Sequence, residues 1–306
     1  MFTDLPRYGL GTAALDWEDP DINAQSAQMV RLAIKNDMHL IDTSPLYGLG
    51  RAEGVMGHAL QGIPRCDYLL STKTGYIANT KTMTAIKTAD PRTKRYPPRD
   101  YSSDHTRKSI ERSLLELGEN YLDIVFIHDP TAGDLHQLKN ATVPTLEKLR
   151  QEKLVRKVGI GLRDVDDARE ILDGLEIDIL MIAGQHTILI QAADLLLEHC
   201  AAKNLPVILA GPMNSGILAN PNQLAPRFDY QPAAQEWITR TNQIADLCQD
   251  HGVPLRAAAL QFPLQDDRIR TVMTGPATMA ELEDTDRLKK FPIPNDLWNA
   301  LQEMSP

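Results

Sequence analysis

The sequence has only three cysteines and no excess of positive charge, and both absences narrow the possible functions. Cys66, Cys200 and Cys248 are widely separated, odd in number, and have no CxxC or CxxH neighbour. Neither a disulfide framework nor a metal site is therefore expected, and free thiols indicate a reducing compartment. The formal net charge of −9 offers no basic stripe, so we expect no nucleic-acid partner and no anionic membrane partner.

Long apolar runs and low-complexity linkers are also missing from the sequence. No stretch approaches about 20 uninterrupted apolar residues, and residues 1–17 show no charged region leading into an apolar core. These absences predict a cytoplasmic protein without a membrane segment. Because no linker divides the 306 residues, we expect one domain over residues 1–306. The oligomeric state is left open.

Short apolar segments alternate along the chain with longer amphipathic ones. The expected strands cover residues 8–15, 40–44, 68–73, 122–128, 157–162, 178–184, 206–211 and 271–275. The expected helices cover residues 24–36, 52–61, 104–117, 143–153, 165–172, 192–203, 232–250 and 279–289. Eight strand-then-helix units predict an α/β fold, the (β/α)8 TIM barrel.

Two longer segments, residues 76–101 and 219–233, each follow the carboxyl end of an expected strand. Barrel enzymes build their sites at that face, so both segments are candidate walls of a substrate pocket. Each can also be an ordinary surface loop.

Four side chains suited to proton transfer lie at or just after the ends of three expected strands. LIDTSPLYG contains Asp42 and Tyr47, LLSTKTG contains Lys73, and VFIHDP contains His128. A phenol has a pKa of about 10 in water, and an ammonium group held by a carboxylate can lower it towards working pH. Each residue alone has an ordinary structural explanation, but all four on one barrel face favour a catalytic site.

Motifs along nearly the whole chain resemble the aldo-keto reductase family. They are YGLGTAAL, LIDTSPLYGLGRAEGVMGHAL, YLLSTKTG, SIERSLLELGENYLDIVFIHDP, LEKLRQEKLVRKVGIG, NSGILA and AAALQFPL. Within the family, IHDP, NSGILA, FDYQPA and HGVPLRAAALQFPL resemble the L-fucose dehydrogenase or D-threo-aldose 1-dehydrogenase group.

The resemblance implies a role for each of the four side chains. Tyr47 would be the general acid/base that exchanges a proton with the substrate oxygen. Lys73, oriented by Asp42, would lower the pKa of Tyr47, and His128 would orient the substrate by hydrogen bonding. Hydride would pass between the substrate carbon and the nicotinamide of a bound nucleotide.

The resemblance also implies a nucleotide site at the strand ends. The candidate residues are Gly11, Thr12, Asp42 and Gln185 near the nicotinamide, Met213, Asn214, Ser215, Gly216 and Leu218 over the pyrophosphate, and Gly275, Thr278, Glu281 and Asp284 near the ribose. Two positions depart from the family pattern. Gly161-Leu162 replaces a common Ser-Asn pair, and Ala210 replaces an aromatic residue that often stacks on the nicotinamide.

NAD is the predicted nucleotide because no cation occurs from Val272 until Arg287, and Glu281 would repel a 2′-phosphate. NADP remains possible, since Arg163 or another loop can supply a cation.

By the resemblance, the expected reaction is oxidation of an aldose at C1 to its lactone. The candidate substrate contacts are Trp17, Tyr76, His128, Arg163, His186 and Asp229. Three alternatives keep the nucleotide site: a pyridoxal 4-dehydrogenase, an NADPH-dependent reductase of small aldehydes and ketones, and a cofactor-sensing channel subunit. A Schiff-base aldolase using Lys73 is a fourth alternative, but it leaves Tyr47 and the loop at residues 214–216 unexplained.

Overall fold

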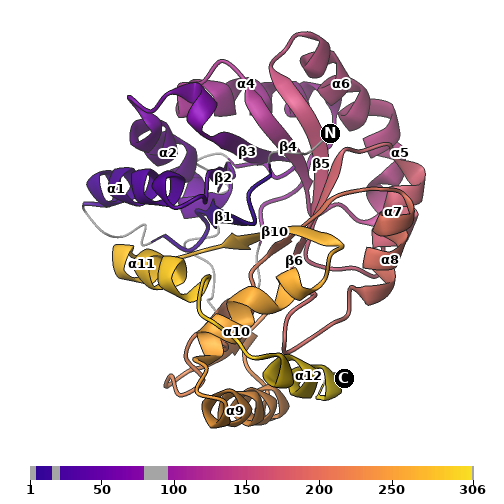
Figure 1. Ribbon diagram of the computed structural model, residues 1–306. Helices are drawn as coiled ribbons and strands as arrows, with labels where there is room; N and C mark the ends of the chain where they lie inside the picture. The colour runs from indigo at the N-terminus through magenta and orange to yellow at the C-terminus, as the bar shows by residue number, and fades with distance from the viewer. Residues whose placement is uncertain (1–4, 16–20, 79–95, 230, 305–306) are drawn as a thin grey trace.

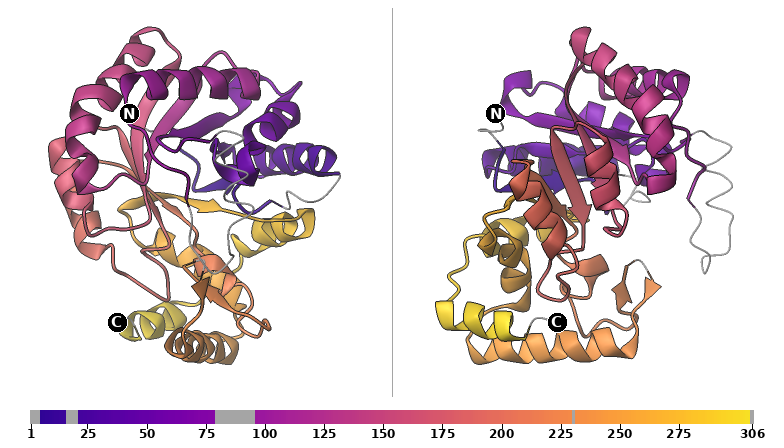
Figure 2. Two further views of the ribbon diagram at one scale, coloured as in Figure 1. Left: turned by 180° about the vertical axis from the view of Figure 1, so that it is seen from behind. Right: turned by 90° about the vertical axis from the view of Figure 1, so that its right-hand side faces the viewer.

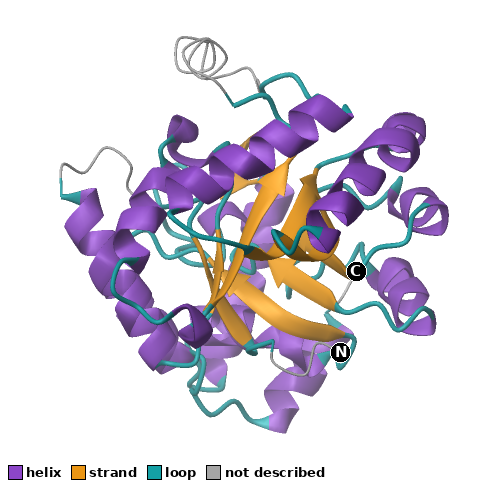
Figure 3. Cartoon of the chain, turned by 90° about the horizontal axis from the view of Figure 1, so that it is seen from above, coloured by secondary structure: helices purple, strands orange, loops and turns teal. Residues whose placement is uncertain are grey.

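The computed structural model describes residues 5–15, 21–78, 96–229 and 231–304. Eight parallel strands close into a barrel in the order β1-β10-β7-β6-β5-β4-β3-β2. Helices surround this barrel, as Figure 1 shows along the barrel axis and Figure 3 from the side of the barrel. The TIM-barrel prediction is therefore confirmed.

Every predicted strand is present, although β1 ends four residues before its predicted end at residue 15, and the other bounds differ by at most two residues. The barrel strands are β1 (Tyr8–Gly11), β2 (Leu40–Asp42), β3 (Leu69–Thr74), β4 (Leu122–His128), β5 (Val155–Leu162), β6 (Ile179–Ala183), β7 (Val207–Ala210) and β10 (Ile269–Thr274). The segment at residues 219–233 contains a separate hairpin of β8 (Arg227–Phe228) and β9 (Gln231–Pro232), seen in the right-hand view of Figure 2. Residues 79–95 of the other long segment lie outside the described residues.

Within residues 5–15, 21–78, 96–229 and 231–304, the helices include three that the sequence pattern did not predict: α5, α10 and α12. The helices are α1 (Ile22–Lys35), α2 (Ala52–Leu60), α4 (Ser103–Leu117), α5 (Leu135–Gln137), α6 (Val143–Gln151), α7 (Ala168–Gly174), α8 (Asp194–Ala202), α9 (Gln235–Asp250), α10 (Leu255–Gln261), α11 (Met279–Leu288) and α12 (Asn295–Glu303). In Figure 1, α9 and α12 lie side by side below the ring of helices.

Helix α4 illustrates how local chemistry sets an element's ends. It begins one residue before the predicted start, because the Ser102 hydroxyl accepts a hydrogen bond from the His105 amide at 3.2 Å. It ends at Gly118, whose left-handed φ of 67° lets its amide reach back to the preceding turn.

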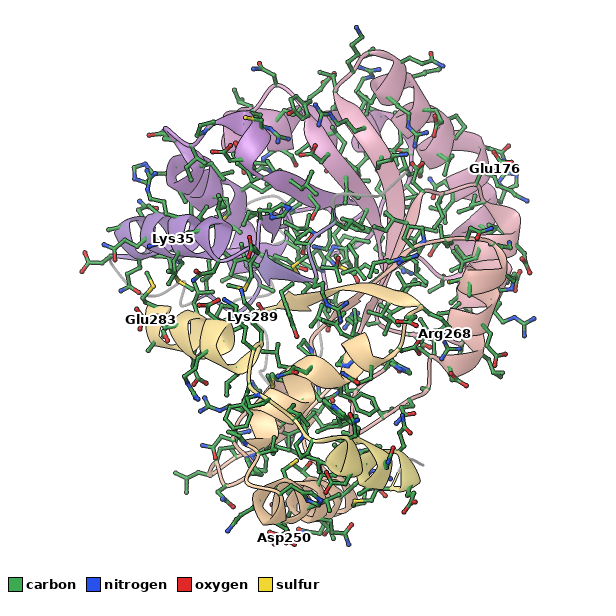
Figure 4. The ribbon with its side chains drawn as sticks, viewed as in Figure 1. Lys35, Glu176, Asp250, Arg268, Glu283 and Lys289 are labelled. Carbon is green, nitrogen blue, oxygen red and sulfur yellow. The ribbon has the colours of Figure 1, made fainter. Side chains whose placement is uncertain are left out.

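Charged side chains project outward from the helices, for example Lys35, Asp250 and Glu283 in Figure 4. Within the part of the chain that is described, no helix has the length and apolar character needed to cross a membrane.

Alternation along the strands separates two apolar regions. Leu40, Ile124, Phe126, Ile179, Met181, Ile208 and Met273 form one cluster, which fills the barrel interior. The intervening residues, such as Ile41 and Val125, belong to the larger cluster between barrel and helices. Gly9 and Gly159 make room for side chains inside the barrel. A Cβ atom at Gly9 would lie 2.8 Å from the Met273 side chain, and one at Gly159 would lie 2.7 Å from the Phe126 ring.

The same alternation positions polar groups at the open end of the barrel. Asp42 follows interior Leu40 by two residues, and His128 follows interior Phe126 by two. Lys73 lies beside Phe126 in the register of β3 and β4. Because side chains two residues apart share a face, Asp42, Lys73 and His128 close the interior at its C-terminal end.

Candidate active site

Asp42 and Lys73 form a buried ion pair at the centre of this end of the barrel. Lys73 Nζ lies 2.6 Å from Asp42 Oδ2, and both side chains are less than 5% exposed. The ammonium also donates to the Thr43 carbonyl at 2.9 Å, and the Ser71 hydroxyl donates to Asp42 Oδ1 at 2.7 Å. Since each charge has several partners, the pair is held in one geometry.

Tyr47 lies directly above the ammonium group. It begins the short 3-10 helix Tyr47–Gly50 after β2, and its ring centroid is 4.5 Å from Lys73 Nζ. The next three residues, Gly48, Leu49 and Gly50, all have positive φ, at 58°, 53° and 89°. This left-handed turn is uncommon for leucine, and it reverses the chain just after the phenol.

The electrostatics of the pair favour a charged lysine and an ionisable phenol. Burial lowers the pKa of Lys73, but Asp42 and Tyr47 both raise it, and the net pKa is above the ordinary value. Lys73 therefore remains an ammonium at working pH. Because the interaction is mutual, the ammonium stabilises the phenolate form of Tyr47.

His128 faces Tyr47 from the end of β4. Their ring centroids are 6.2 Å apart in an edge-to-face arrangement, and its Nδ1 lies 3.5 Å from the Ser44 hydroxyl oxygen. Burial, and then the charges of Lys73 and Arg163, hold the pKa of His128 well below its ordinary value. The imidazole is therefore neutral and can give or accept one hydrogen bond at each nitrogen.

A polar wall stands beside His128. Tyr76 packs edge-to-face on the imidazole with 5.0 Å between centroids, and its hydroxyl donates to Asp129 Oδ2 at 3.2 Å. Arg163 Nε donates to the same oxygen at 2.9 Å, and Arg163 also hydrogen-bonds the Tyr96 hydroxyl. Asp129 was not among the predicted site residues, although it directly follows His128 in the IHDP motif.

The residues predicted near the nicotinamide lie around the same opening. Thr12 follows Gly11 at the end of β1, and its buried hydroxyl has no hydrogen-bond partner among the described residues. Gln185 Nε2 donates to the Arg163 carbonyl at 2.7 Å, which leaves Oε1 as an acceptor. An unused hydroxyl and an amide oxygen suit the carboxamide of a nicotinamide, so these residues fit the nucleotide.

The loop predicted to cover the pyrophosphate is fixed from within. Asn214 Nδ2 donates to the Gly184 carbonyl at 3.0 Å, and its Oδ1 accepts from Thr187 at 2.6 Å. This clamp ties the loop after β7 to the loop after β6. Leu218 is fully buried in the core, so only its backbone can take part in binding. Gly216 has φ 98° with open space beside it.

Helix α11 begins at the predicted ribose site. Thr278 accepts from the Glu281 amide at 3.3 Å, and the Glu281 carboxylate accepts from the Ala277 amide at 2.7 Å. Gly275 precedes this turn, and a Cβ atom there would lie 3.7 Å from Ala14. Glu281 therefore supplies negative charge to a helix start that otherwise attracts anions.

Tertiary structure brings a cation to this site that the local sequence does not contain. Arg256, at the start of α10, lies 2.7 Å from Asp284, and Arg287 lies 2.6 Å from the same carboxylate. The absence of a cation between Val272 and Arg287 is therefore a property of the sequence alone. Arg256 thus supplies, beside Asp284, the positive charge that the local sequence lacks.

Two other predicted substrate residues, His186 and Asp229, lie outside the contacts that join Asp42, Tyr47, Lys73 and His128. His186 is buried, lies 3.4 Å from Asp266, and packs against Phe262 with 6.1 Å between centroids. Asp229 is exposed in the hairpin between β8 and β9. Trp17 lies outside the described residues.

Most of the chain matches known proteins in sequence. The sequence model of the aldo/keto reductase family matches residues 7–306. D-threo-aldose 1-dehydrogenase from a Pseudomonas species is 34% identical over 270 residues, which is 86% of this chain and 82% of the relative. Pyridoxal 4-dehydrogenase from Microbacterium luteolum is 28% identical over 96% of this chain and 92% of its own.

The fold also matches solved structures. An aldo-keto reductase from Bacillus halodurans in its holo form superposes with a TM-score of 0.77 at 21% identity, covering 98% of this chain and 92% of that one. At this identity the match shows the fold alone.

Proposed function

Because the chain belongs to the aldo-keto reductase family, the NAD(P)-dependent oxidoreductases, we propose that it oxidises an aldose at C1 to the lactone. The observation that carries this proposal is the gathering of Asp42, Tyr47, Lys73 and His128 at one end of the barrel. A sugar of the L-fucose, L-galactose or D-arabinose type is the proposed substrate. The 34% identical relative, named for aldose oxidation, supports this choice.

Each side chain has a defined role in the proposed oxidation. The Tyr47 phenolate takes the proton of the C1 hydroxyl, Lys73 stabilises that phenolate, and His128 donates a hydrogen bond to the reacting oxygen. A bound nicotinamide nucleotide supplies the hydride acceptor, so C1 loses a hydride as the carbonyl forms. In the reverse direction the same groups would reduce a carbonyl.

The polar wall beside His128 supports a hydroxylated substrate. Asp129 uses Oδ2 for Tyr76 and Arg163, and no hydrogen bond from the described residues reaches its Oδ1. That oxygen can accept a bond from a sugar hydroxyl near C1, while Arg163 donors can contact ring oxygens. A small aldehyde would leave this wall unused. Pyridoxal, whose hemiacetal resembles a lactol, is the second candidate because of the 28% identical relative.

We propose NAD as the preferred nucleotide. Glu281 occupies the start of α11, where it repels a 2′-phosphate and can accept a bond from a ribose hydroxyl. Arg256 and Arg287 act in the opposite direction, but Asp284 neutralises part of their charge. Because the negative charge of Glu281 outweighs the partly neutralised charges of the two arginines, we expect faster turnover with NAD. We also expect some activity with NADP, which should depend on Arg256.

The test is reduction of NAD and NADP at alkaline pH with L-fucose, L-galactose, D-arabinose, L-rhamnose and pyridoxal. Rapid NADH formation with one sugar supports the proposal. Oxidation of pyridoxal alone would select the second candidate, and NADPH-dependent reduction of small aldehydes without sugar oxidation would overturn both. Arg256→Ala serves as the nucleotide control, because it should lower activity with NADP several-fold while leaving NAD nearly unchanged.

A further inference from the structure

Ser44 connects the two sides of the active site, although neither its residue type nor the DTSP motif marks it as functional. It is 1% exposed and lies two residues after Asp42. Its carbonyl accepts the Tyr47 amide at 3.0 Å, its hydroxyl accepts the Leu46 amide at 3.2 Å, and that hydroxyl lies 3.5 Å from His128 Nδ1. One residue thus contacts the turn that holds the phenol and the imidazole opposite it.

The direction of these hydrogen bonds follows from counting protons. The Leu46 amide can only donate, so the Ser44 oxygen must accept from it. The hydroxyl hydrogen of Ser44 is then left to donate, and His128 Nδ1 is the acceptor within reach among the described residues. If Nδ1–H instead donated to the second lone pair of the Ser44 oxygen, this buried hydroxyl hydrogen would have no acceptor among the described residues. A neutral imidazole that accepts at Nδ1 carries its proton at Nε2.

We propose that Ser44 is a positioning residue that fixes His128 as the Nε2–H tautomer. This inference rests on the proposed roles of Tyr47 and His128 in oxidation. The Nε2–H group can donate to the reacting oxygen in both directions, whether that oxygen is a hydroxyl or a carbonyl. The other tautomer would present a lone pair, which repels the lone pairs of a carbonyl oxygen and competes with Tyr47 for a hydroxyl proton.

Other contacts of His128 leave the tautomer undetermined. The Tyr101 hydroxyl donates to the backbone carbonyl of His128 at 2.9 Å, and Tyr47 and Tyr76 meet the imidazole as edge-to-face rings. None of these contacts donates to or accepts from a ring nitrogen. The 3.5 Å separation from Ser44 is long for a hydrogen bond, as is common at catalytic sites before substrate binds, and it should shorten in the ternary complex.

The decisive measurement is the tautomer of His128 by nitrogen NMR on protein with 15N-labelled histidine. The chain has eight histidines, and His128→Gln identifies the relevant signals. At pH 7.5 the wild-type protein should show the Nε2–H form. Ser44→Ala should shift the Nδ1 signal and populate both tautomers, and Ser44→Thr, which keeps the hydroxyl, should restore the wild-type pattern.

Turnover provides the second readout. Ser44→Ala should lower kcat about 10- to 100-fold, with the nucleotide Kd unchanged. This is less than the loss of about 10²- to 10³-fold for removing a donor that contacts the transition state, because Ser44 acts through His128. Thr74→Val is the matched control, because it removes a buried hydroxyl that has no partner among the described residues and should leave the His128 signals in place.

The NMR result is independent of the proposed reaction, since it needs no substrate. A wild-type His128 in the Nδ1–H form, or a tautomer unchanged in Ser44→Ala, would overturn the role of Ser44. If every sugar fails to react but the tautomer responds to Ser44→Ala, the reaction proposal fails while the Ser44 proposal stands.

Discussion

The two halves of the barrel's open end differ in what their strands place there. Strands β2 to β4 end in Asp42, Lys73 and His128, which are buried and held by hydrogen bonds. The interior positions at the same end of β5, β6 and β7 are Gly161, Ala183 and Ala210, which carry almost no side chain. One half thus concentrates charge and proton donors, while the other leaves space.

This difference separates chemistry from binding. A proton-transfer group needs neighbours that fix its position and charge, which the first half provides. A nicotinamide ring is flat and would need room and an apolar surface to bind. The small residues of the second half, Gly161, Ala183 and Ala210, leave that room beside His128. The register places Gly161 directly next to His128, so the two halves meet where a substrate carbon and a nicotinamide would have to meet.

The largest expected effect comes from removing the phenolic oxygen in the charged half. Tyr47→Phe should lower turnover by about 10³-fold, since a positioned acid or base contributes about 10²- to 10⁴-fold. The nucleotide Kd, measured by fluorescence titration, should stay within about twofold. Near-normal turnover by this variant would show that the charged half does not carry the chemistry.

The next largest effect is expected at Glu53, a buried carboxyl group of α2 that contacts β3 on the helix side of the barrel wall. Glu53 Oε1 accepts a hydrogen bond from the Thr72 hydroxyl at 2.6 Å, and Thr72 directly precedes Lys73 in the chain. Burial raises the pKa of Glu53 from 4.5 to about 7, while Thr72 lowers it in part. The folded protein therefore binds more protons than the unfolded chain between these values, and stability falls as pH rises through that window.

Glu53→Gln should remove this loss of stability. The free energy of unfolding of the variant, relative to wild type, should rise by about 3 kcal/mol between pH 4.5 and 8, at about 1.4 kcal/mol for each pKa unit. Urea unfolding at several pH values measures the difference. A pH-independent difference would mean that Glu53 is charged in both states. Glu116 and Arg112 of α4 also act on Glu53, in opposite directions.

The smallest expected effect comes from filling the space of the second half. Gly161→Leu should raise the nucleotide Kd about tenfold, or about 1.4 kcal/mol, without a large change in Tm. A Cβ atom at Gly161 would have its nearest neighbour at 3.8 Å, so the backbone position itself tolerates a side chain.

Gly159 provides the matched control on the same strand. A Cβ atom at Gly159 would lie 2.7 Å from Ile179 and Phe126, so Gly159→Ala should cost about 1–3 kcal/mol of stability with little effect on the nucleotide Kd of the folded protein. Unchanged nucleotide binding by Gly161→Leu would place the ring elsewhere.

Sequence patterns predicted the barrel well because its strands are short apolar runs and the helices between them are longer and amphipathic. They failed at α10 and α12, which follow other helices instead of strands and so break the strand-then-helix rhythm. They also placed His186 at the substrate site, although its contacts are with Asp266 and Phe262. A polar residue after a strand can turn toward either layer, and only its packing partners decide which.

The sequence by itself determined the eight strands and the helices that follow them, and hence the shared end of the barrel where Asp42, Lys73 and His128 lie. These properties depend on neighbours in the chain, through short apolar runs and amphipathic periodicity. The tertiary structure decided the contacts between distant segments: Ser44 with His128, Asp129 with Arg163, and Arg256 with Asp284. Such pairs are set by how strands and helices pack, which no local pattern encodes.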